Sequence, residues 1–197
     1  MIIVDTETTG MEVTKHALLS IGAIDLQNPD YIFYEECRIW EGAHVDDEAL
    51  KINGFSKESI TDSKKQSEKD TIEHFLKWIE GCSEHTLAGQ NTSFDRDFLK
   101  SAVYRYHINW PFTYRVIDLY SVAYAHMISH GVTPPVKGKH SDLNLDKILV
   151  YCGIMFTRGV HNALEDAKLE AEALSRLFFG KGLLPEFAKF SIPWISK

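Results

Sequence analysis

The chain has 197 residues, of which 44% are hydrophobic and 25% are charged, and its formal net charge is −7 at pH 7. These proportions are typical of a globular domain with one substantial core, and they exclude an intrinsically disordered chain. No stretch approaches the roughly 18 to 20 apolar residues of a membrane span, and the start of the chain lacks the basic and long apolar regions of a signal peptide. We therefore expect a cytoplasmic protein without membrane partners.

The first half of the chain predicts an antiparallel meander followed by helices. Three stretches rich in apolar residues indicate strands, and the turn-forming residues 28–30 are expected to join the second strand to the third. Two helices and a short buried strand should follow, given the spacing of their apolar residues. The expected ranges are strands at 2–5, 16–26, 31–40 and 86–88, and helices at 46–52 and 66–79.

Helices and strands alternate in the second half. Residues 131–140 contain two prolines and two glycines, which favour a mobile loop near the substrate. The tail at 181–197 contains three large aromatic residues, and we expect it to pack on the domain formed by residues 1–180. The other expected ranges are helices at 94–107, 118–128, 143–151 and 162–179, and a strand at 115–117.

Two carboxylates stand at the end of the first expected strand. Asp5 and Glu7 are two residues apart, so their side chains should project from one face of the strand while Thr6 points to the other. Two acids about 4 Å apart repel by about 4 kcal/mol at an effective dielectric near 20, and a divalent cation removes that repulsion. The pair predicts a metal site, although a solvated strand end would give the same pattern.

A second polar group opens the helix expected at 94–107. Asp95 lies near the helix N-terminus, where the helix dipole and free N–H groups favour an ionised carboxylate. Such a carboxylate can hold a cation or orient a water molecule beside it. Asn91 and Phe94 precede it in the same segment. An ordinary acidic residue in a first helical turn is the alternative.

A third group opens the last helix. Asp166 is one residue from the apolar stripe of this helix and can face inward, while His161 in the preceding loop can lie over the same point. By itself, this histidine would more often be a capping or solvated residue. The stripe consists of Ala163, Ala167, Ala171, Leu174 and Phe178, and Lys168, Glu172 and Arg176 are expected elsewhere on the helix surface.

In order, spacing and flanking residues, these three groups resemble the motifs of the DEDDh family of 3′-to-5′ exonucleases over most of the chain. Within the family, the pattern is most similar to the proofreading (epsilon) subunit of bacterial DNA polymerase III and its stand-alone relatives. His161 lies five residues before Asp166, as in the histidine subclass, and Asn162 stands where the sister subclass has tyrosine. The resemblance implies a ribonuclease-H-like α/β fold, in which a mixed five-stranded sheet with an antiparallel meander of its first three strands is flanked by helices.

The resemblance also implies phosphodiester hydrolysis with two divalent cations, Mg²⁺ or Mn²⁺. Asp5 would bridge both ions, Glu7 and Asp166 would complete one of the two sites, and Asp95 would act mainly through a water molecule. His161 would be the general base, because an imidazole with a pKa of about 6.5 accepts a proton around neutral pH. These five are the predicted catalytic residues, and the four acids are the predicted metal ligands.

The predicted substrate contacts follow from the same resemblance. The family uses the segment Thr8-Thr9-Gly10-Met11 to hold the terminal nucleotide through backbone N–H groups and an apolar side chain, which would be that of Met11. Asn91 is expected to hydrogen-bond the backbone of a single strand. Phe94 is expected either to stack on a base or ribose or to belong to the core.

The net charge of −7 opposes nucleic-acid binding unless the basic residues are concentrated. Residues 96–147 carry seven lysines and arginines against four acids, a local balance of +3. This positive excess would guide a single strand of nucleic acid. Alternatively, these basic residues only form an ordinary solvated surface. In polymerase-associated relatives a C-terminal segment binds the polymerase, so a polymerase or a repair protein is a further partner that the resemblance suggests.

The leading hypothesis is a metal-dependent 3′-to-5′ exonuclease that releases nucleoside 5′-monophosphates from single-stranded ends, with DNA preferred over RNA. An exoribonuclease acting on short RNAs or RNA 3′ ends would use the same five residues. A catalytically idle binding module is disfavoured, because an inactive descendant has no chemical reason to keep all five. A phosphomonoesterase is disfavoured by Glu7, since that class has an aspartate there and a later lysine motif.

Overall fold

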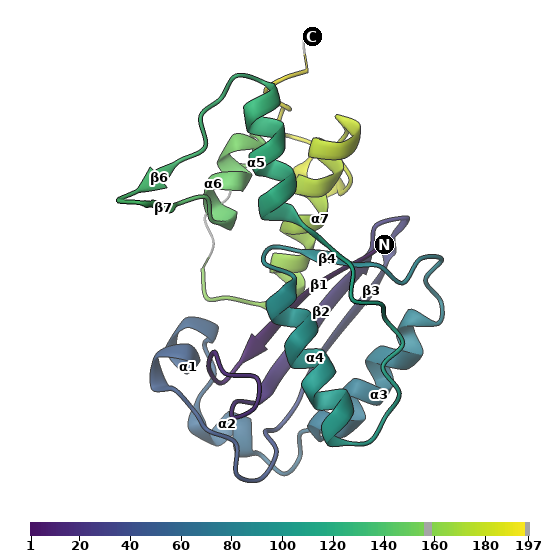
Figure 1. Ribbon diagram of the computed structural model, residues 1–197. Coiled ribbons are helices and arrows are strands. Elements are labelled where there is room, and N and C mark those ends of the chain that lie inside the picture. Colours follow the sequence, from purple (N-terminus) through teal and green to yellow (C-terminus); the bar gives the residue numbers. More distant parts are fainter. Residues whose placement is uncertain (156–158, 196–197) are drawn as a thin grey trace.

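The computed structural model describes residues 1–155 and 159–195, which form a mixed five-stranded sheet with helices on both faces (Figure 1). The strand order is β3-β2-β1-β4-β5, in which the first three strands pair antiparallel and the last two run parallel to β1. The predicted fold class is confirmed. The strands are β1 (Ile2–Thr8), β2 (Leu18–Asp25), β3 (Asn28–Glu36), β4 (Leu87–Gly89) and β5 (Val116–Asp118).

The helices bury two apolar clusters, one on each face of the sheet. Helices α3 and α4 cover the face to which Ile2 and Val4 point, and helices α5, α6 and α7 cover the face to which Ile3 points. By the same alternation, Asp5 and Glu7 lie on the α7 side of β1. The helices are α1 (Asp47–Asn53), α2 (Lys57–Thr61), α3 (Glu68–Ile79), α4 (Ser93–Arg105), α5 (Leu119–Ser129), α6 (Leu145–Tyr151), α7 (Ala163–Phe179) and the 3-10 helix η1 (Pro185–Phe187).

The turn expected at residues 28–30 is wrong, because these residues belong to β3. The chain reverses two residues earlier, where the Gln27 N–H donates to the Asp25 side chain at 3.1 Å and Asp25 pairs with Asn28. Pro29 is tolerated within β3 because β3 is an edge strand, in which a missing N–H need not cost a ladder hydrogen bond. The side chain of Asp25, before the turn, therefore stabilises the reversal, and Pro29 lies after it.

The loop expected at residues 131–140 is partly a β-hairpin. Strands β6 (Val136–Lys137) and β7 (His140–Ser141) pair antiparallel around a two-residue turn, and Gly138 in that turn has a φ of 63°. Glycine at φ > 0 favours such a tight turn, and its presence could have signalled the hairpin. The short helix α2 was also absent from the sequence prediction, although Ser56 and Ser59 form a capping box at its start.

Two of the three polar side chains expected on the surface of α7, those of Glu172 and Arg176, are instead buried, and Lys168 is half-buried. Glu172 and Arg176 are 0% and 1% exposed, whereas Phe178 of the predicted stripe is 40% exposed. The Arg176 guanidinium pairs with Glu172 at 2.7 Å and donates to the carbonyl of Phe187 at 3.1 Å. The other Glu172 oxygen accepts from the N–H groups of Leu183 and Leu184 at 2.7 and 2.9 Å.

The segment after α7 covers this ion pair. The segment after α7 returns across it and replaces solvent around both charges, and Leu184 and Phe187 join the apolar cluster on that face. A buried pair of this kind is retained only when its remaining hydrogen-bonding groups are satisfied, and backbone groups of the tail satisfy them here. Within the described residues, no helix is both long and apolar enough to cross a membrane.

Candidate active site

A cleft of about 950 Å³ opens where β1 ends. Its walls come from β1 and the loop after it, from α1, and from the first residues of α4, α6 and α7. These segments are far apart in the sequence and meet at the edge of the sheet (Figure 1). All five predicted catalytic residues line this cleft, namely Asp5, Glu7, Asp95, His161 and Asp166.

Three of these residues form a compact set of ligand atoms. One atom each of Glu7, His161 and Asp166 lies within 4.8 Å of the others. The two carboxylates are buried, at 5% and 4% exposure, while the imidazole is 40% exposed, and its Nδ1 lies 3.8 Å from the Asp166 carboxylate. Two buried carboxylates beside a half-exposed imidazole are a donor set that suits a divalent cation.

Gly22 on β2 allows α7 to bring Asp166 to β1. It pairs with Asp5 in the sheet register, and a Cβ on Gly22 would lie 2.2 Å from the backbone of Ala163 and of Leu164. Real Cβ atoms essentially never approach so closely, so only glycine permits this contact. A register shift in β1 just after Glu7 adds a bulge at the rim of the cleft.

Asp95 reaches the site from the first turn of α4 and is held against β1. Its Oδ1 accepts from the backbone N–H of Thr6 at 2.9 Å and from the Thr6 hydroxyl at 2.8 Å. Burial raises the pKa of Asp95 to about 7, although the two bonds from Thr6 act in the opposite direction. The threonine between the two acids of β1 therefore fixes a third acid.

The negative charge of Asp5 is unfavourable in this site. Burial raises its pKa well above the ordinary value, and the neighbouring acids Asp95, Glu170, Glu7 and Asp166 raise it further. Such an excess of buried negative charge is what a bound cation would relieve.

Glu170 is a cleft residue that the sequence prediction missed. It lies one helical turn after Asp166, is 1% exposed, and lines the cleft beside the other acids. A Cβ at Gly89 would lie 2.8 Å from its carboxylate, so the glycine at the end of β4 makes room for it. Its spacing of four residues from Asp166 places both acids on one face of α7 and could have identified it.

The predicted substrate segment after β1 is only partly accessible. Met11 is 75% exposed at the cleft, as expected for an apolar wedge, and Thr8 and Gly10 also line it. Thr9, in contrast, does not line the cleft. Its side chain is 0% exposed and donates to the carbonyl of His44 at 2.7 Å, and its N–H donates to Ala17 at 2.9 Å, so Thr9 holds the loop in place instead.

Asn91 and Phe94 both line the cleft. Asn91 is exposed, adopts a φ of 57°, and its N–H donates to the Asp118 side chain at 2.9 Å, which fixes the turn before α4. Phe94 is half-buried and its ring centroid lies 4.8 Å from that of Phe98. The two readings of Phe94 are therefore compatible, because one part of the ring packs on the core while another part faces the cleft.

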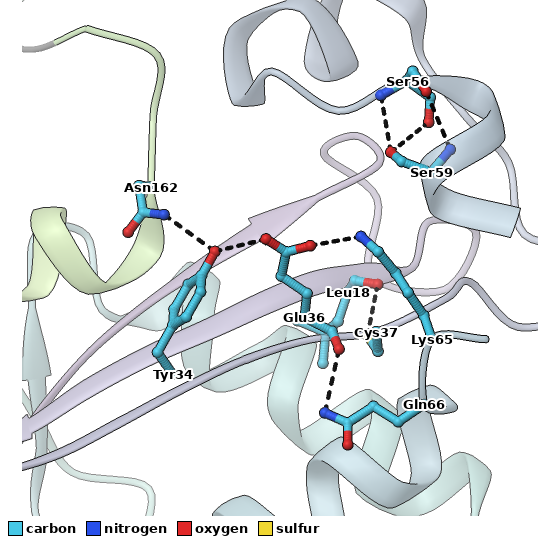
Figure 2. Close-up of polar contacts among 9 residues, drawn as sticks. All are labelled: Leu18, Tyr34, Glu36, Cys37, Ser56, Ser59, Lys65, Gln66 and Asn162. Carbon is cyan, nitrogen blue, oxygen red and sulfur yellow. Dashed lines mark hydrogen bonds and ion pairs between the residues drawn. The ribbon is translucent and has the colours of Figure 1, made fainter. Parts of the chain in front are cut away.

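A chain of hydrogen bonds ties the start of α7 to the edge strand β3 (Figure 2). The Asn162 side chain accepts from Leu164 and Glu165 at 3.1 Å, as an N-cap residue does, and its amide donates to the Tyr34 hydroxyl at 3.1 Å. Tyr34 in turn donates to Glu36 at 3.0 Å, and Lys65 pairs with Glu36 at 2.5 Å. Burial and Glu36 raise the pKa of Tyr34 to about 12, so its hydroxyl stays protonated and keeps both bonds.

Replacing Tyr34 with phenylalanine removes the anchor of Asn162 without adding volume. We expect kcat to fall by a factor of about 3 to 10, which corresponds to the roughly 0.5 to 1.5 kcal/mol of one hydrogen bond, because the loop that carries His161 loses a fixed position. KM should not change, since Tyr34 does not line the cleft. A steady-state comparison with Tyr31→Phe checks this, because the Tyr31 hydroxyl bonds to Trp78 at 3.0 Å elsewhere. Equal effects of both substitutions on kcat would contradict it.

The sequence profile of the exonuclease (RNase_T) family matches residues 2–174 of the chain. The chain therefore belongs to this family, and the predicted relationship to 3′-to-5′ exonucleases is confirmed at that level. Among curated proteins, ribonuclease T of Haemophilus influenzae is 28% identical over 117 residues, covering 53% of this chain and 51% of that protein. Ribonuclease T of Yersinia pestis is 28% identical over 117 residues, covering 53% and 54%. The chain thus spans about half the length of the curated relatives it matches.

Solved structures share the fold at low sequence identity. Cell-death related nuclease 4 (CRN-4) superposes with a TM-score of 0.70 at 19% identity, covering 92% of this chain and 64% of that one. E. coli exonuclease I in complex with a dT13 oligonucleotide gives 0.71 at 17% identity, covering 89% and 40%. The nuclease domain of 3′hExo, a DEDDh family member bound to rAMP, gives 0.67 at 15% identity, covering 93% of each chain.

Proposed function

We propose that the protein is a metal-dependent 3′-to-5′ exonuclease that removes nucleoside 5′-monophosphates from single-stranded ends. The observation that carries this proposal is the meeting of Glu7, His161 and Asp166 within 4.8 Å, in a cleft that also contains Asp5 and Asp95. Membership of the exonuclease family supports it. The spacing of the motifs supports the histidine subclass, since His161 and not a tyrosine lies beside Asp166.

Four carboxylates would hold the metal, namely those of Asp5, Glu7, Asp95 and Asp166. Carboxylate oxygens suit hard cations such as Mg²⁺ and Mn²⁺, and the raised pKa of Asp5 reflects its burial among other acids. We propose two ions, because two divalent charges balance four carboxylates. When bound, the ions would neutralise charge on the scissile phosphate and increase the acidity of the attacking water. Glu170 adds a fifth carboxylate to the cleft, and its negative charge would raise cation affinity.

His161 is the proposed general base. Its backbone N–H donates to Ile52 on α1 at 3.2 Å, and Asn162 after it caps α7, so the loop is held from two sides. The side chain is 40% exposed, which leaves it accessible to a substrate in the cleft. An imidazole there can take the proton of the attacking water, which a carboxylate bound to a cation does poorly.

DNA is the proposed preferred substrate, and RNA is the alternative. Complexes of exonuclease I with dT13 and dA16 among the structural neighbours support DNA. The ribonuclease T relatives and the rAMP complex of 3′hExo favour RNA. The closer likeness of the motifs to the epsilon proofreading subunit, and with it a polymerase or repair partner, remains a proposal that rests on the sequence resemblance.

The test is degradation of matched DNA and RNA strands, each labelled at the 5′ or the 3′ end, with Mg²⁺, Mn²⁺ or a chelator. A 5′ label should give a ladder of shortening products, a 3′ label should release a labelled mononucleotide at once, and the chelator should stop both. Asp5→Asn, purified identically, is the control for contaminating nuclease. Shortening from the 5′ end, undiminished activity in chelator, or an Asp5→Asn protein as active as the parent would each overturn the proposal.

The shifted pKa values predict an unusual pH dependence of stability without metal. The folded pKa of Asp95 is about 7, that of Asp5 is also raised, and both lie well above the ordinary value of 3.8. The folded state therefore binds more protons than the unfolded chain, and the stability that these groups contribute is lost as the pH rises through about 7. In chelator, the Tm should be higher at a pH of about 5.5 than at about 8.

Metal should reverse this dependence, because cations and protons compete for the same oxygens. Adding Mn²⁺ should raise the Tm more at the higher pH than at the lower one. Asp95→Asn should flatten the dependence measured in chelator. Thermal scans over this pH range would contradict the account if the metal-free Tm rose with pH, or if Mn²⁺ raised it equally at both values.

A further inference from the structure

The hairpin β6–β7 carries a cluster of basic residues that takes no part in packing the core. Lys137, Lys139 and His140 stand within four residues, and both strands are exposed on every side. Figure 1 shows the hairpin projecting beyond α6, away from the sheet. It contributes no residue to the described apolar clusters, so its conformation has little to do with core packing.

The hairpin is nevertheless anchored in a defined place. Pro134 is buried at its start, and the Asp142 N–H donates to the carbonyl of Pro135 at 2.9 Å, which closes its base. Gly138 turns the tip into open space, with nothing within 4 Å of the position of a Cβ. Such a hairpin holds its lysines at a fixed point without burying their charge.

These lysines are free to meet an external anion. Within residues 1–155 and 159–195, neither Lys137 nor Lys139 makes a salt bridge. The nearby acid Asp142 pairs with Lys147, and Lys137 helps to lower the pKa of Asp142 without forming an ion pair with it. In a chain of net charge −7, exposed cations without salt-bridge partners stay hydrated and can attract external anions. Their position decides which anion can reach them.

The chain runs from the hairpin into the wall of the catalytic cleft. Strand β7 ends at Ser141, and Asn144 and Leu145, three and four residues later, line the cleft wall. At about 3.5 Å per extended residue, Lys139 lies at most about 18 Å and Lys137 at most about 25 Å from Asn144. The cleft itself is rich in acids, so a nucleic-acid strand needs a source of attraction outside it.

We propose that the hairpin β6–β7 binds the phosphates of the strand that precedes the terminal nucleotide, and so selects single strands longer than a few nucleotides. The inference deepens the proposed exonuclease function and rests on it for the direction of the strand. Lys137 and Lys139 hold phosphates, while the cleft holds the scissile bond. Binding by phosphate charge alone gives no preference among base sequences.

The test compares Lys137→Ala/Lys139→Ala with the parent on two substrates. One is a single strand of about twelve nucleotides, and the other is the p-nitrophenyl ester of thymidine 5′-monophosphate, which is too small to reach the hairpin. We expect KM for the strand to rise about tenfold at low salt, and the salt slope of log(kcat/KM) to shrink by about 1.4, from two contacts of about 0.7 each. Neither constant for the ester should change.

A matched control removes two exposed lysines of α3, in Lys69→Ala/Lys77→Ala, and should behave like the parent. An unchanged KM and salt slope for the strand in the hairpin variant would overturn the proposal, as would an equal loss in the α3 control or on the ester. If the parent hydrolyses neither substrate, the proposed function fails. The fluorescence anisotropy of a labelled strand then still tests whether the hairpin binds nucleic acid. Weaker binding by the hairpin variant but not by the α3 control supports the proposal, and equal binding by all three proteins refutes it.

Discussion

Replacing His161 with alanine is expected to lower kcat by a factor of about 10² to 10⁴, the contribution of a general base, while Mn²⁺ affinity changes little. The imidazole lies 3.8 Å from Asp166 and is 40% exposed, so it faces the substrate side of the acid cluster. Steady-state rates on a single strand and titration of Mn²⁺ binding measure the two effects separately.

His85→Ala is the matched control, because His85 is exposed and does not line the cleft. It should leave both kcat and Mn²⁺ affinity at parental values. If His161→Ala kept full turnover across neutral pH, His161 would not be the base. If its Mn²⁺ affinity fell together with kcat, the imidazole would be a metal ligand, as its distances to Glu7 and Asp166 also permit.

Replacing Gly22 with alanine should lower kcat although Gly22 does not line the cleft. The added methyl would lie 2.2 Å from the backbone at Ala163 and Leu164, so the start of α7 must move away from β2. A displacement of about 1 Å between catalytic groups can cost a factor of about 10² in rate, and overpacking of this kind costs about 1 to 3 kcal/mol of stability. We expect kcat to fall by at least about 10² in a protein that still folds.

Activity should be measured well below the Tm, and the circular dichroism spectrum should confirm that the variant is folded. Gly131→Ala is the control for lost stability alone. Gly131 has a φ of 71° with nothing within 4 Å of a Cβ, so alanine there strains the backbone without touching the cleft. Parental activity in Gly22→Ala would show that the close approach of α7 to β2 does not place Asp166.

Local motifs made the sheet and the five cleft residues predictable. The alternation of Asp5 with Glu7, the place of Asp95 in a first helical turn and the spacing of His161 from Asp166 each depend on near neighbours in the sequence. The structure brings all five to one cleft. Strand ends were less predictable, since β1 continues past Asp5 to Thr8 through pairing with Leu18, a partner that is not local.

What escaped prediction depends on contacts between distant segments. The periodicity of α7 marked Glu172 and Arg176 as polar surface, because a sequence pattern does not show that the tail would return and bury both. Glu170 escaped prediction because its burial depends on the cleft and on the space that Gly89 of β4 leaves for it. Thr9 stands in the expected substrate segment, yet its bonds to His44 and Ala17 follow only from the folded loop.

The most direct test of the central claim is a crystal structure grown with Mn²⁺ and a nucleoside 5′-monophosphate, with data collected at the manganese absorption edge. The account predicts anomalous peaks between Asp5, Glu7 and Asp166, with the phosphate beside them and the His161 ring facing it. Manganese bound only elsewhere, or the nucleotide bound away from these side chains, would contradict it.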